Sequence, residues 1–262
     1  MKKAIAVILF AIACNSVAIA QNEAEEYAEK KFVTKKGDTL LYQMLYPLEY
    51  GSQKKYPLVV FLHGAGERGN DNKKQLTHGG SLFLKEDVRR AFPAIVIFPQ
   101  CPTEDFWSSV KIQRSENGAS FTFDYSEDPN KPLKLVLDLI KQLEKMEAVD
   151  SKRIYVMGLS MGGMGTFELL AREPKKFAAA IPICGGGNPA DCEKYADDVP
   201  LWVFHGAKDN IVNPQHSREM VEALKRLGAD VTYTEYPDAG HNSWDQAFAE
   251  SGLLKWLFSM EK

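Results

Sequence analysis

The chain has 262 residues, of which 45% are apolar and 26% are charged, a composition that suits one globular domain with a sizeable core. Its formal net charge is −3, and no block rich in Lys and Arg occurs. Because a protein that binds nucleic acid normally carries a basic face, we do not expect nucleic acid as a partner.

The start of the chain has the features of a secretory signal peptide. Lys2 and Lys3 give a basic start, residues 4–13 form an apolar run, and "AIA" at residues 18–20 is a small-residue cleavage site. The apolar run is too short to span a bilayer as a stable helix, so we predict no transmembrane segment.

These features set the expected domain organisation. We predict that residues 1–20 are a signal peptide cleaved after Ala20, and that residues 21–262 form one domain. The protein is then expected to be periplasmic or secreted. A lipoprotein anchored through Cys14 is the alternative.

The first predicted elements are two short alternating runs, in residues 31–34 and 39–46. The "KKGD" between them is a hairpin signal. We therefore expect the ordered part of the chain to begin with an antiparallel pair of strands.

From residue 57 onwards, short apolar runs alternate with helical patterns. The runs are nearly continuous, as is typical of strands buried on both faces, and they cover residues 57–64, 94–100, 153–158, 177–187, 200–206 and 231–237. The helical patterns cover Ser81–Ala91, Leu133–Met146, Met161–Arg172, Pro214–Leu227 and Trp244–Met260. This alternation predicts an α/β fold, with a mostly parallel sheet and helices on both faces.

Residues 102–132 are the longest stretch in which we find no clear periodicity. They carry five aromatic residues, which are Phe106, Trp107, Phe121, Phe123 and Tyr125. A loop of this length is usually functional or disordered, and the aromatic content argues against disorder. We therefore expect a functional loop.

Three cysteines follow the predicted signal peptide, at positions 101, 184 and 192. Cys184 and Cys192 are the nearest pair in sequence, and a disulfide between them stays open. Cys101 and Cys184 otherwise suit buried apolar positions. Because no CxxC spacing and no histidine cluster accompanies them, we predict no metal site and no cofactor.

The segment "GLSMG" at residues 158–162 matches the pattern G-x-S-x-G. A phosphate-binding loop would need a lysine that is absent here, and a dinucleotide fingerprint would need a different glycine spacing. The serine falls between a strand-like and a helix-like run, where a sharp turn strains the backbone and leaves no room for neighbouring side chains. Ser160 is therefore the predicted nucleophile.

A serine hydroxyl needs a base that removes its proton. Of the five histidines, His241 lies between the last predicted strand and the last predicted helix, and it is the predicted base. His78 is an alternative if its loop folds over the site. His63 and His205 each end a strand before a glycine and are expected to structure their loops, and His216 is expected on the surface of a helix.

The base in turn needs a carboxylate that fixes its tautomer. Asp209 follows a predicted strand and lies between Ser160 and His241 in the chain. Asp238 is the rival, but it is too near His241 in sequence to approach the ring easily from the opposite side. The order Ser, Asp, His is that of the α/β-hydrolases.

The glycine-rich segment "FLHGAGERGND" follows the first long apolar run. An oxyanion hole needs two N–H donors, one from such a loop and one from the residue after the nucleophile. We predict Ala65, or alternatively Gly66, together with Met161. Glu67 and Arg68 either form a local ion pair or contact the substrate.

Taken together, these segments resemble the secreted esterases of carbohydrate esterase family one, which includes feruloyl esterases and acetyl xylan esterases. Close relatives of that group are labelled predicted peptidases or phospholipase/carboxylesterases. The layout is also similar to that of dienelactone hydrolases, which carry a cysteine where this chain has Ser160. The resemblance covers roughly residues 30–260 and rests on "HGAGERGNDN", "FPQCP", "RIYVMGLSMGGMGT", "PICGGG", "FHGAKDNIV" and "GHNSW".

The resemblance implies an α/β-hydrolase fold and an exported serine esterase that works through an acyl-enzyme. It makes Ser160 the nucleophile, His241 the base and Asp209 its orienting carboxylate, with Ala65 and Met161 as the oxyanion donors. The implied substrate is a plant polysaccharide or oligosaccharide esterified with feruloyl or acetyl groups.

The substrate contacts are less well defined. Phe106, Trp107 and Trp244 are candidates for stacking on the substrate, although each equally suits a packing role, and Glu67 is a further candidate contact. The choice of acyl group and the oligomeric state stay open. Two other functions also stay open: a serine peptidase of the prolyl-oligopeptidase type, and a non-catalytic carbohydrate-binding protein on a hydrolase fold.

Overall fold

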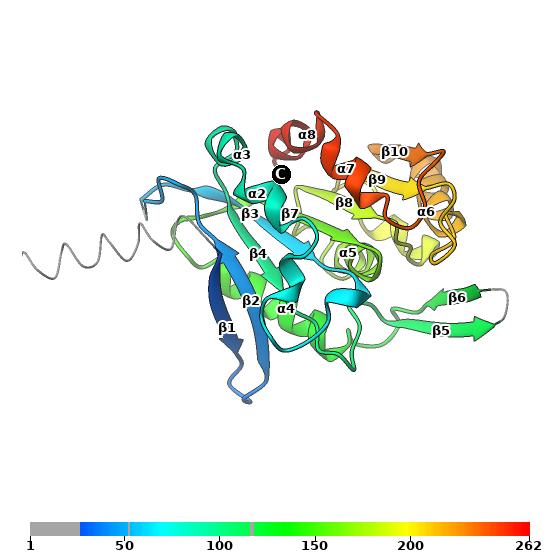
Figure 1. Cartoon of the computed structure of the whole chain (residues 1–262), viewed down its shortest axis with the longest axis horizontal. Coiled ribbons are helices and arrows are strands. Elements are labelled where there is room, and N and C mark those ends of the chain that lie inside the picture. Colours follow the sequence, from blue (N-terminus) through cyan, green and yellow to red (C-terminus); the bar gives the residue numbers. More distant parts are fainter. Residues whose placement is uncertain (1–26, 52, 116–117) are drawn as a thin grey trace, which may run out of the picture.

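The computed structural model describes residues 27–51, 53–115 and 118–262 (Figure 1). The predicted signal peptide and Cys14 lie outside these ranges. No helix within the described ranges is both long and apolar enough to cross a membrane.

One eight-stranded sheet forms the centre of the fold, in the order β1-β2-β4-β3-β7-β8-β9-β10. β2 is antiparallel to both of its neighbours, and all other neighbouring strands are parallel. The predicted hairpin and the six predicted apolar runs are all strands of this sheet, so the prediction of a mostly parallel sheet is confirmed. The strands are β1 (Ala28–Val33), β2 (Thr39–Leu45), β3 (Tyr56–Leu62), β4 (Ile95–Pro99), β7 (Val149–Leu159), β8 (Ala179–Ile183), β9 (Leu201–Gly206) and β10 (Val231–Tyr236).

Both faces of the sheet are covered by helices. Along β3, Leu58 and Val60 pack into one apolar cluster while Val59 and Phe61 pack into the other, which explains the continuous apolar run of a doubly buried strand. One face carries α4 (Lys131–Leu143), α5 (Met161–Arg172) and α6 (Gln215–Arg226). The other carries α2 (Gly80–Leu84), α3 (Glu86–Ala91), α7 (Trp244–Ala249) and α8 (Leu253–Ser259).

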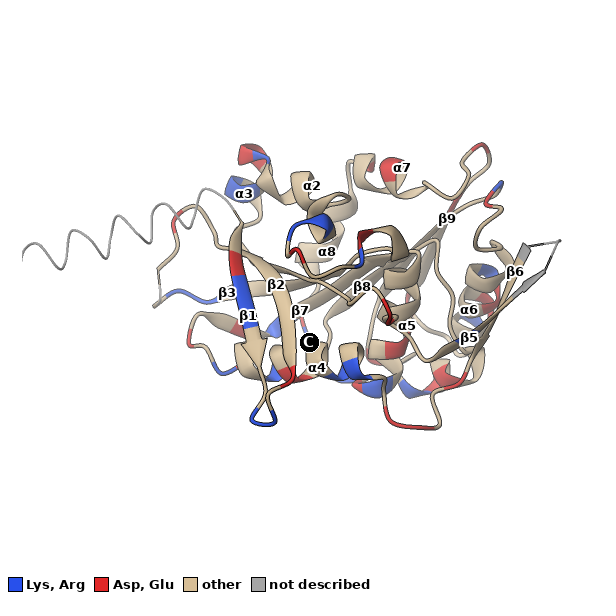
Figure 2. Ribbon diagram, turned by 60° about the horizontal axis from the view of Figure 1, so that its bottom comes forward, with Lys and Arg blue, Asp and Glu red and all other residues tan. Residues whose placement is uncertain are grey.

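Charged residues lie mainly on the outer elements. Figure 2 shows Lys and Arg interspersed with Asp and Glu over the helices and loops. β3, β4 and β8 carry no charged residue, as burial on both faces requires. Three short 3-10 helices complete the connections: η1 (Ala65–Glu67), η2 (Lys74–Leu76) and η3 (Pro189–Lys194).

Two of the predicted helices are each divided in the structure. The pattern over Ser81–Ala91 forms α2 and α3, because Lys85 between them has an extended ψ of 128°. The pattern over Trp244–Met260 forms α7 and α8, which are separated where Glu250 turns extended, with a ψ of 115°. The apolar periodicity continues across each break, and for that reason the sequence pattern did not reveal it.

The expectation that residues 102–132 form an irregular loop is wrong. They contain an antiparallel two-stranded sheet of β5 (Val110–Ser115) and β6 (Gly118–Phe123), which extends away from the main sheet (Figure 1). Ile112 pairs directly with Phe121, and Val110 pairs with Phe123. These pairs lie on one face of the β5–β6 hairpin, so the period-two alternation of a half-buried strand was present in the sequence.

All three described cysteines are buried free thiols. The disulfide between Cys184 and Cys192 that the sequence left open is therefore not formed. Burial raises the pKa of both thiols, which keeps them protonated and unreactive.

Candidate active site

Ser160 occupies a sharp turn between the end of β7 and the start of α5. Its backbone has φ 54° and ψ −115°, in a region that non-glycine residues rarely adopt. Such a conformation costs about 1–3 kcal/mol and persists only where surrounding contacts enforce it. Here the Ser160 N–H donates to the Ile183 carbonyl at 2.8 Å, which ties the turn to the end of β8.

The flanking glycines are required by close backbone contacts. A Cβ atom on Gly158 would lie 2.2 Å from the Gly162 carbonyl oxygen, and one on Gly162 would lie 1.9 Å from the Leu62 carbonyl oxygen. Both distances are far inside van der Waals contact, and both neighbours are backbone atoms that cannot move aside. The turn that presents Ser160 therefore excludes any larger residue at these two positions.

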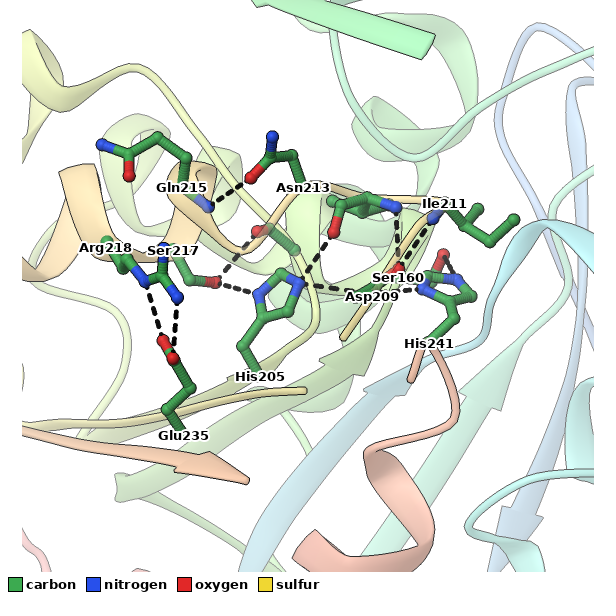
Figure 3. A network of polar contacts seen from close by, with 12 residues as sticks. Ser160, His205, Asp209, Ile211, Asn213, Gln215, Ser217, Arg218, Glu235 and His241 are labelled. Carbon is green, nitrogen blue, oxygen red and sulfur yellow. Dashed lines mark hydrogen bonds and ion pairs between the residues drawn. The ribbon is translucent and has the colours of Figure 1, made fainter. Parts of the chain in front are cut away.

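The structure brings Ser160, His241 and Asp209 into one hydrogen-bonded array, hereafter the triad (Figure 3). His241 Nε2 lies 2.9 Å from Ser160 Oγ, and His241 Nδ1 lies 2.7 Å from Asp209 Oδ2. The three side chains follow β7, β9 and β10, at the carboxyl edge of the sheet where ligands of α/β folds bind. This is the geometry in which an imidazole takes a proton from a serine hydroxyl.

Asp209 is buried but well supplied with donors. Its Oδ1 accepts the N–H groups of Ile211 at 2.9 Å and Val212 at 3.0 Å. Burial alone would raise the pKa of Asp209, but the hydrogen bonds from His205 and His241 hold it well below its usual range. The group is therefore a carboxylate that can orient an imidazole and stabilise its charged form.

The two predicted oxyanion donors lie beside Ser160. Met161 is the first residue of α5 and Ala65 is the first residue of η1, positions at which backbone N–H groups have no acceptor within the helix. Both residues line the same cavity as Ser160. Both positions agree with the predicted role of these N–H groups as donors to an oxygen that becomes negative during attack on a carbonyl.

This cavity has a volume of about 330 Å³ and is mostly apolar. Ser160 lies in its wall, together with Asn210 as the other residue with a polar side chain. One side is formed by the hairpin and another by the loop that follows Asp209. The lining residues are Ala65, Phe106, Ile112, Ala119, Phe121, Ser160, Met161, Met164, Asn210, Ile211 and Val212.

The base of the β5–β6 hairpin is attached to α5, the helix that follows Ser160, through a buried carboxylate. Glu168 of α5 accepts from the hydroxyls of Ser108 and Ser109, each at 2.9 Å, and from the Ser109 N–H. The same carboxylate pairs with Arg172 one turn later, at 2.8 Å. The cavity wall is thereby fixed to α5, the helix that begins directly after Ser160.

The outer strand of the hairpin packs on α6 through aromatic contacts. The rings of Phe121 and Phe123 meet the His216 imidazole edge to face, with centroids 5.6 and 5.9 Å apart. Burial lowers the pKa of His216, so the ring is uncharged at neutral pH. The expectation that His216 is a surface residue is corrected by this half-buried position.

The predicted substrate contacts have different positions in the structure. Phe106 lines the cavity, as a substrate contact would. Trp107 does not, because its side chain is completely buried and its Nε1–H donates to the His63 carbonyl at 3.1 Å. Of the two roles that the sequence left open for Trp107, the structure shows the packing role and not the substrate contact. The place of Trp107 in a loop next to the site did not show whether its ring packs beneath the loop or faces the substrate.

Trp244 and Glu67 do not line this cavity, and both lie near His78. The Trp244 ring meets the His241 imidazole edge to face at 5.4 Å and the His78 imidazole at 5.0 Å. Glu67 Oε1 lies 3.8 Å from His78 Nε2. Arg68 donates to the carbonyls of Ala65 and Asp105, so Glu67 lies beside His78 rather than forming the local ion pair with Arg68 that the sequence allowed.

His63 has the loop-building role that the sequence indicated. Its Nε2 accepts the Cys101 N–H at 2.9 Å, and its Nδ1 lies 2.6 Å from the Gly64 carbonyl. Burial lowers the pKa of His63 to about 4, which fits an uncharged ring that donates at one nitrogen and accepts at the other. It thereby fixes the loop that carries Ala65.

One group of metal-ligand types lies close together among the described residues. Atoms of Cys184, Asp209 and His241 lie within 4.8 Å of one another. However, burial raises the pKa of the Cys184 thiol, and metals bind the thiolate. The other two side chains are already hydrogen-bonded to each other, so the group is a poor fit for a metal ion.

The sequence interpretation missed two parts of the site. The hairpin wall could have been found from the alternation of Val110 and Ile112, and of Ala119, Phe121 and Phe123. His205, which we treated as structural, contacts Asp209 directly. Its spacing of four residues from Asp209 was the available signal.

Comparison with known proteins relates this chain to hydrolases. The phospholipase/carboxylesterase family profile matches residues 47–251. A bifunctional acetylxylan esterase/xylanase from Neocallimastix patriciarum is 30% identical over 159 residues, which cover 61% of this chain and 20% of that protein. Further relatives, 23–27% identical, include acyl-protein thioesterases and dipeptidyl peptidases.

Two solved structures share the fold. A thermostable esterase superposes with a TM-score of 0.81 at 35% identity, covering 92% of this chain and 64% of that one. A family one ferulic acid esterase from Anaeromyces mucronatus superposes with a TM-score of 0.65 at 15% identity, covering 89% and 90% of the two chains. The predicted α/β-hydrolase fold is confirmed. This chain spans about a fifth of the acetylxylan esterase/xylanase and 64% of the thermostable esterase.

Proposed function

The chain belongs to the phospholipase/carboxylesterase family and is a serine hydrolase of the esterase type, and from this premise we propose that it removes hydroxycinnamoyl groups such as ferulate from a plant polysaccharide. The observation that carries the choice of acyl group is the apolar cavity of about 330 Å³ beside Ser160. Cavities of about 300–1,000 Å³ hold organic ligands of moderate size. An acetyl group would leave most of this apolar wall in contact with water, whereas an aromatic acyl group would cover it.

The triad geometry supports an acyl-enzyme route. Ser160 Oγ attacks the ester carbonyl carbon while its proton passes to His241 Nε2, and the N–H groups of Ala65 and Met161 hold the oxyanion. His241 then gives the proton to the departing alcohol oxygen as the carbon–oxygen bond breaks. Water attacks the acyl-enzyme with His241 again as base, which releases the carboxylic acid and restores the Ser160 hydroxyl.

The polysaccharide and the export route are part of the proposal. They are supported by the signal-peptide pattern of residues 1–20 and by the relative that is an acetylxylan esterase/xylanase. Expression in the native host followed by N-terminal analysis tests export: a mature chain that begins at Gln21 is expected. A lipidated Cys14 would establish the lipoprotein alternative, and an unprocessed chain would contradict export.

A matched pair of substrates tests the acyl preference. 4-Nitrophenyl ferulate and 4-nitrophenyl acetate share a leaving group, so the ratio of their kcat/KM values reports the acyl group alone. We expect a higher value for the ferulate, and the same order for feruloylated over acetylated xylan. Equal kcat/KM values for the two esters, or a higher value for the acetate, would mean that the cavity binds a part of the substrate other than the acyl group.

Peptidase activity is the second candidate, because dipeptidyl peptidases are among the relatives. Aminoacyl-proline 4-nitroanilides added to the same panel distinguish it, and we expect hydrolysis far slower than that of the ferulate ester. Ser160→Ala should remove turnover of every substrate and labelling by a fluorophosphonate. Retained turnover in that variant would exclude Ser160 as the nucleophile.

A further inference from the structure

A second imidazole contacts the carboxylate of the triad. His205 is the penultimate residue of β9 and is completely buried. Its Nε2 lies 3.1 Å from Asp209 Oδ2, the same oxygen that His241 Nδ1 approaches at 2.7 Å (Figure 3). Asp209 therefore lies between two histidines, only one of which reaches the nucleophile.

The surroundings of His205 determine where its proton lies. Nε2 faces Asp209 Oδ2 and, at 3.0 Å, the Val212 carbonyl oxygen. In the ionised carboxylate and in the carbonyl, both oxygens can only accept hydrogen bonds. Nε2 must therefore carry a hydrogen, which it shares between Asp209 Oδ2 and the Val212 carbonyl oxygen.

The other ring nitrogen is held by α6. His205 Nδ1 lies 2.7 Å from Ser217 Oγ, which lies 3.0 Å from the Gly185 carbonyl. The Ser217 hydroxyl has one proton, which goes either to Nδ1 or to the Gly185 oxygen. The first arrangement leaves His205 neutral and the second makes it an imidazolium, but Nε2 donates to Asp209 in both.

Four donors thus converge on one buried carboxylate. The N–H groups of Ile211 and Val212 hold Oδ1, and the two imidazoles share Oδ2. The donor from His205 fixes Oδ2 from the side away from Ser160. It also draws electron density from the oxygen that stabilises the charged form of His241.

We propose that His205 is a positioning residue of the triad, which holds Asp209 Oδ2 in line with His241 and moderates the basicity of that imidazole. The proposal rests on the proposed function of Ser160. His205 is not among the residues that line the substrate cavity, so it acts on catalysis only through Asp209.

Other titratable groups around His205 are accounted for. Glu235 is its register partner on β10, and this carboxylate is paired with Arg218 of α6 at 2.7 and 2.9 Å. His216 of α6 also faces it, and the pKa of His216 is lowered by burial. Cys184, at the end of β8, lies beside Asp209 as a protonated thiol. Apart from the triad itself, no unpaired charge among these groups competes for the His205 proton.

Two substitutions distinguish the hydrogen bond that His205 donates from the space that its ring fills. His205→Gln keeps an N–H donor near the position of Nε2, whereas His205→Leu removes it. For 4-nitrophenyl ferulate we expect His205→Leu to lower kcat by about 10- to 100-fold, as a small misplacement of a reacting group does, with KM nearly unchanged. The acid limb of its kcat/KM profile should move to higher pH. His205→Gln should restore both the rate and the acid limb toward wild type.

A wild-type measurement keeps the proposal testable if His205→Leu does not fold. In protein labelled with 15N-histidine, the His205 signal, assigned by its loss in His205→Gln, should show a protonated Nε2 at pH 7. An unprotonated Nε2 would overturn the proposal, as would a His205→Leu enzyme with the kcat and acid limb of wild type.

Control variants show whether a negative result rules out the positioning role of His205 or the proposed function of Ser160. Tyr155→Phe removes another hydrogen bond, a partly buried one from Tyr155 to the Met260 carbonyl at 2.8 Å, and should lower stability without moving the pH profile. If Ser160→Ala is inactive while His205→Leu resembles wild type, only the positioning role is lost. If Ser160→Ala stays active, the proposed function itself is wrong.

Discussion

The two regions that meet at Ser160 are built in different ways. The triad and the predicted oxyanion donors lie just after β3, β7, β9 and β10, at one edge of a doubly covered sheet. The hairpin of β5 and β6 is a separate two-stranded sheet, anchored at its base by Glu168 and resting on α6 through His216. The sheet edge thus positions the triad, whereas an added element shapes the cavity beside Ser160.

This difference predicts that rate and selectivity can be changed separately. Substitutions at the sheet edge should change turnover of all esters by the same factor. Substitutions in the hairpin should change the ratio between a bulky and a small acyl group.

The largest effect is expected at the sheet edge, from Asp209→Asn. The amide favours the wrong tautomer of His241, and kcat should fall about 10⁴-fold, for 4-nitrophenyl ferulate and for 4-nitrophenyl acetate alike. The rival Asp238→Asn is the matched control, because that side chain is exposed and pairs with Lys208 at 2.6 Å; its activity should be that of wild type. A loss confined to one substrate would show that the sheet edge also contributes to selectivity.

The second-largest effect is expected from a substitution of Glu168, which anchors the base of the hairpin. In Glu168→Gln the half-buried Arg172 loses its charged partner and the hydroxyls of Ser108 and Ser109 lose a charged acceptor. The free energy of unfolding should fall by about 1–3 kcal/mol, as when a hydrogen bond to a charged group is removed. Because the cavity wall loosens, the ferulate-to-acetate ratio should fall as well. Urea denaturation and the matched esters measure the two quantities.

The control for the anchor is an exposed pair with the same spacing. Glu86 and Arg90 of α3 also lie four residues apart, at 2.7 Å, but both side chains are mostly exposed. Glu86→Gln should cost less than about 1 kcal/mol and leave the ester ratio unchanged. Equal losses from the two variants would mean that Glu168 is not an anchor.

The two regions also differ in how far the sequence predicted them. Ser160, Asp209 and His241 follow doubly buried strands, whose apolar runs are strong signals, and the glycines around Ser160 mark a turn that admits no other residue. The hairpin strands mix apolar residues with Lys, Gln, Ser and Thr, so their alternation was weak and we predicted a loop.

Burial within loops was the other feature that the sequence could not reveal. Trp107 and Phe106 are adjacent aromatic residues, yet one is completely buried and the other lines the cavity. The difference depends on the Trp107 hydrogen bond to the His63 carbonyl and on its packing against Gly165 of α5. These contacts join segments 44 and more residues apart, which no local pattern encodes.

Acidification should lower the free energy of unfolding through His63, which directly follows β3. Burial chiefly lowers its pKa to about 4 from an ordinary value of 6.5, so the unfolded chain binds a proton in this interval that the folded chain does not. Stability is therefore complete above about pH 6.5 and falls as the pH drops toward 4, by about 3 kcal/mol from this group. His216, whose pKa is also lowered, adds in the same direction.

The carboxylate of Glu235 does not contribute to a decline in that window. The pKa of Glu235 is held at about 2, chiefly by its Arg218 partner, and its contribution is lost only below its ordinary value of 4.5. Denaturation in urea from pH 7 to 4.5 measures the slope, and His63→Gln should flatten it although the variant is less stable at every pH. An unchanged slope in His63→Gln would assign the decline to other groups.

The smallest and most selective effect is expected from Phe121→Ala in the hairpin. Phe121 lines the cavity, and its loss removes an apolar contact that a ferulate ring would make but an acetyl group would not. One such contact is worth about 1–3 kcal/mol, so kcat/KM for 4-nitrophenyl ferulate should fall about tenfold or more, while that for the acetate changes little. Phe123→Ala is the matched control, because Phe123 makes the same edge-to-face contact with His216 but does not line the cavity. If both variants lower the ferulate rate equally, the hairpin acts by supporting α6, and the acyl group must be held elsewhere.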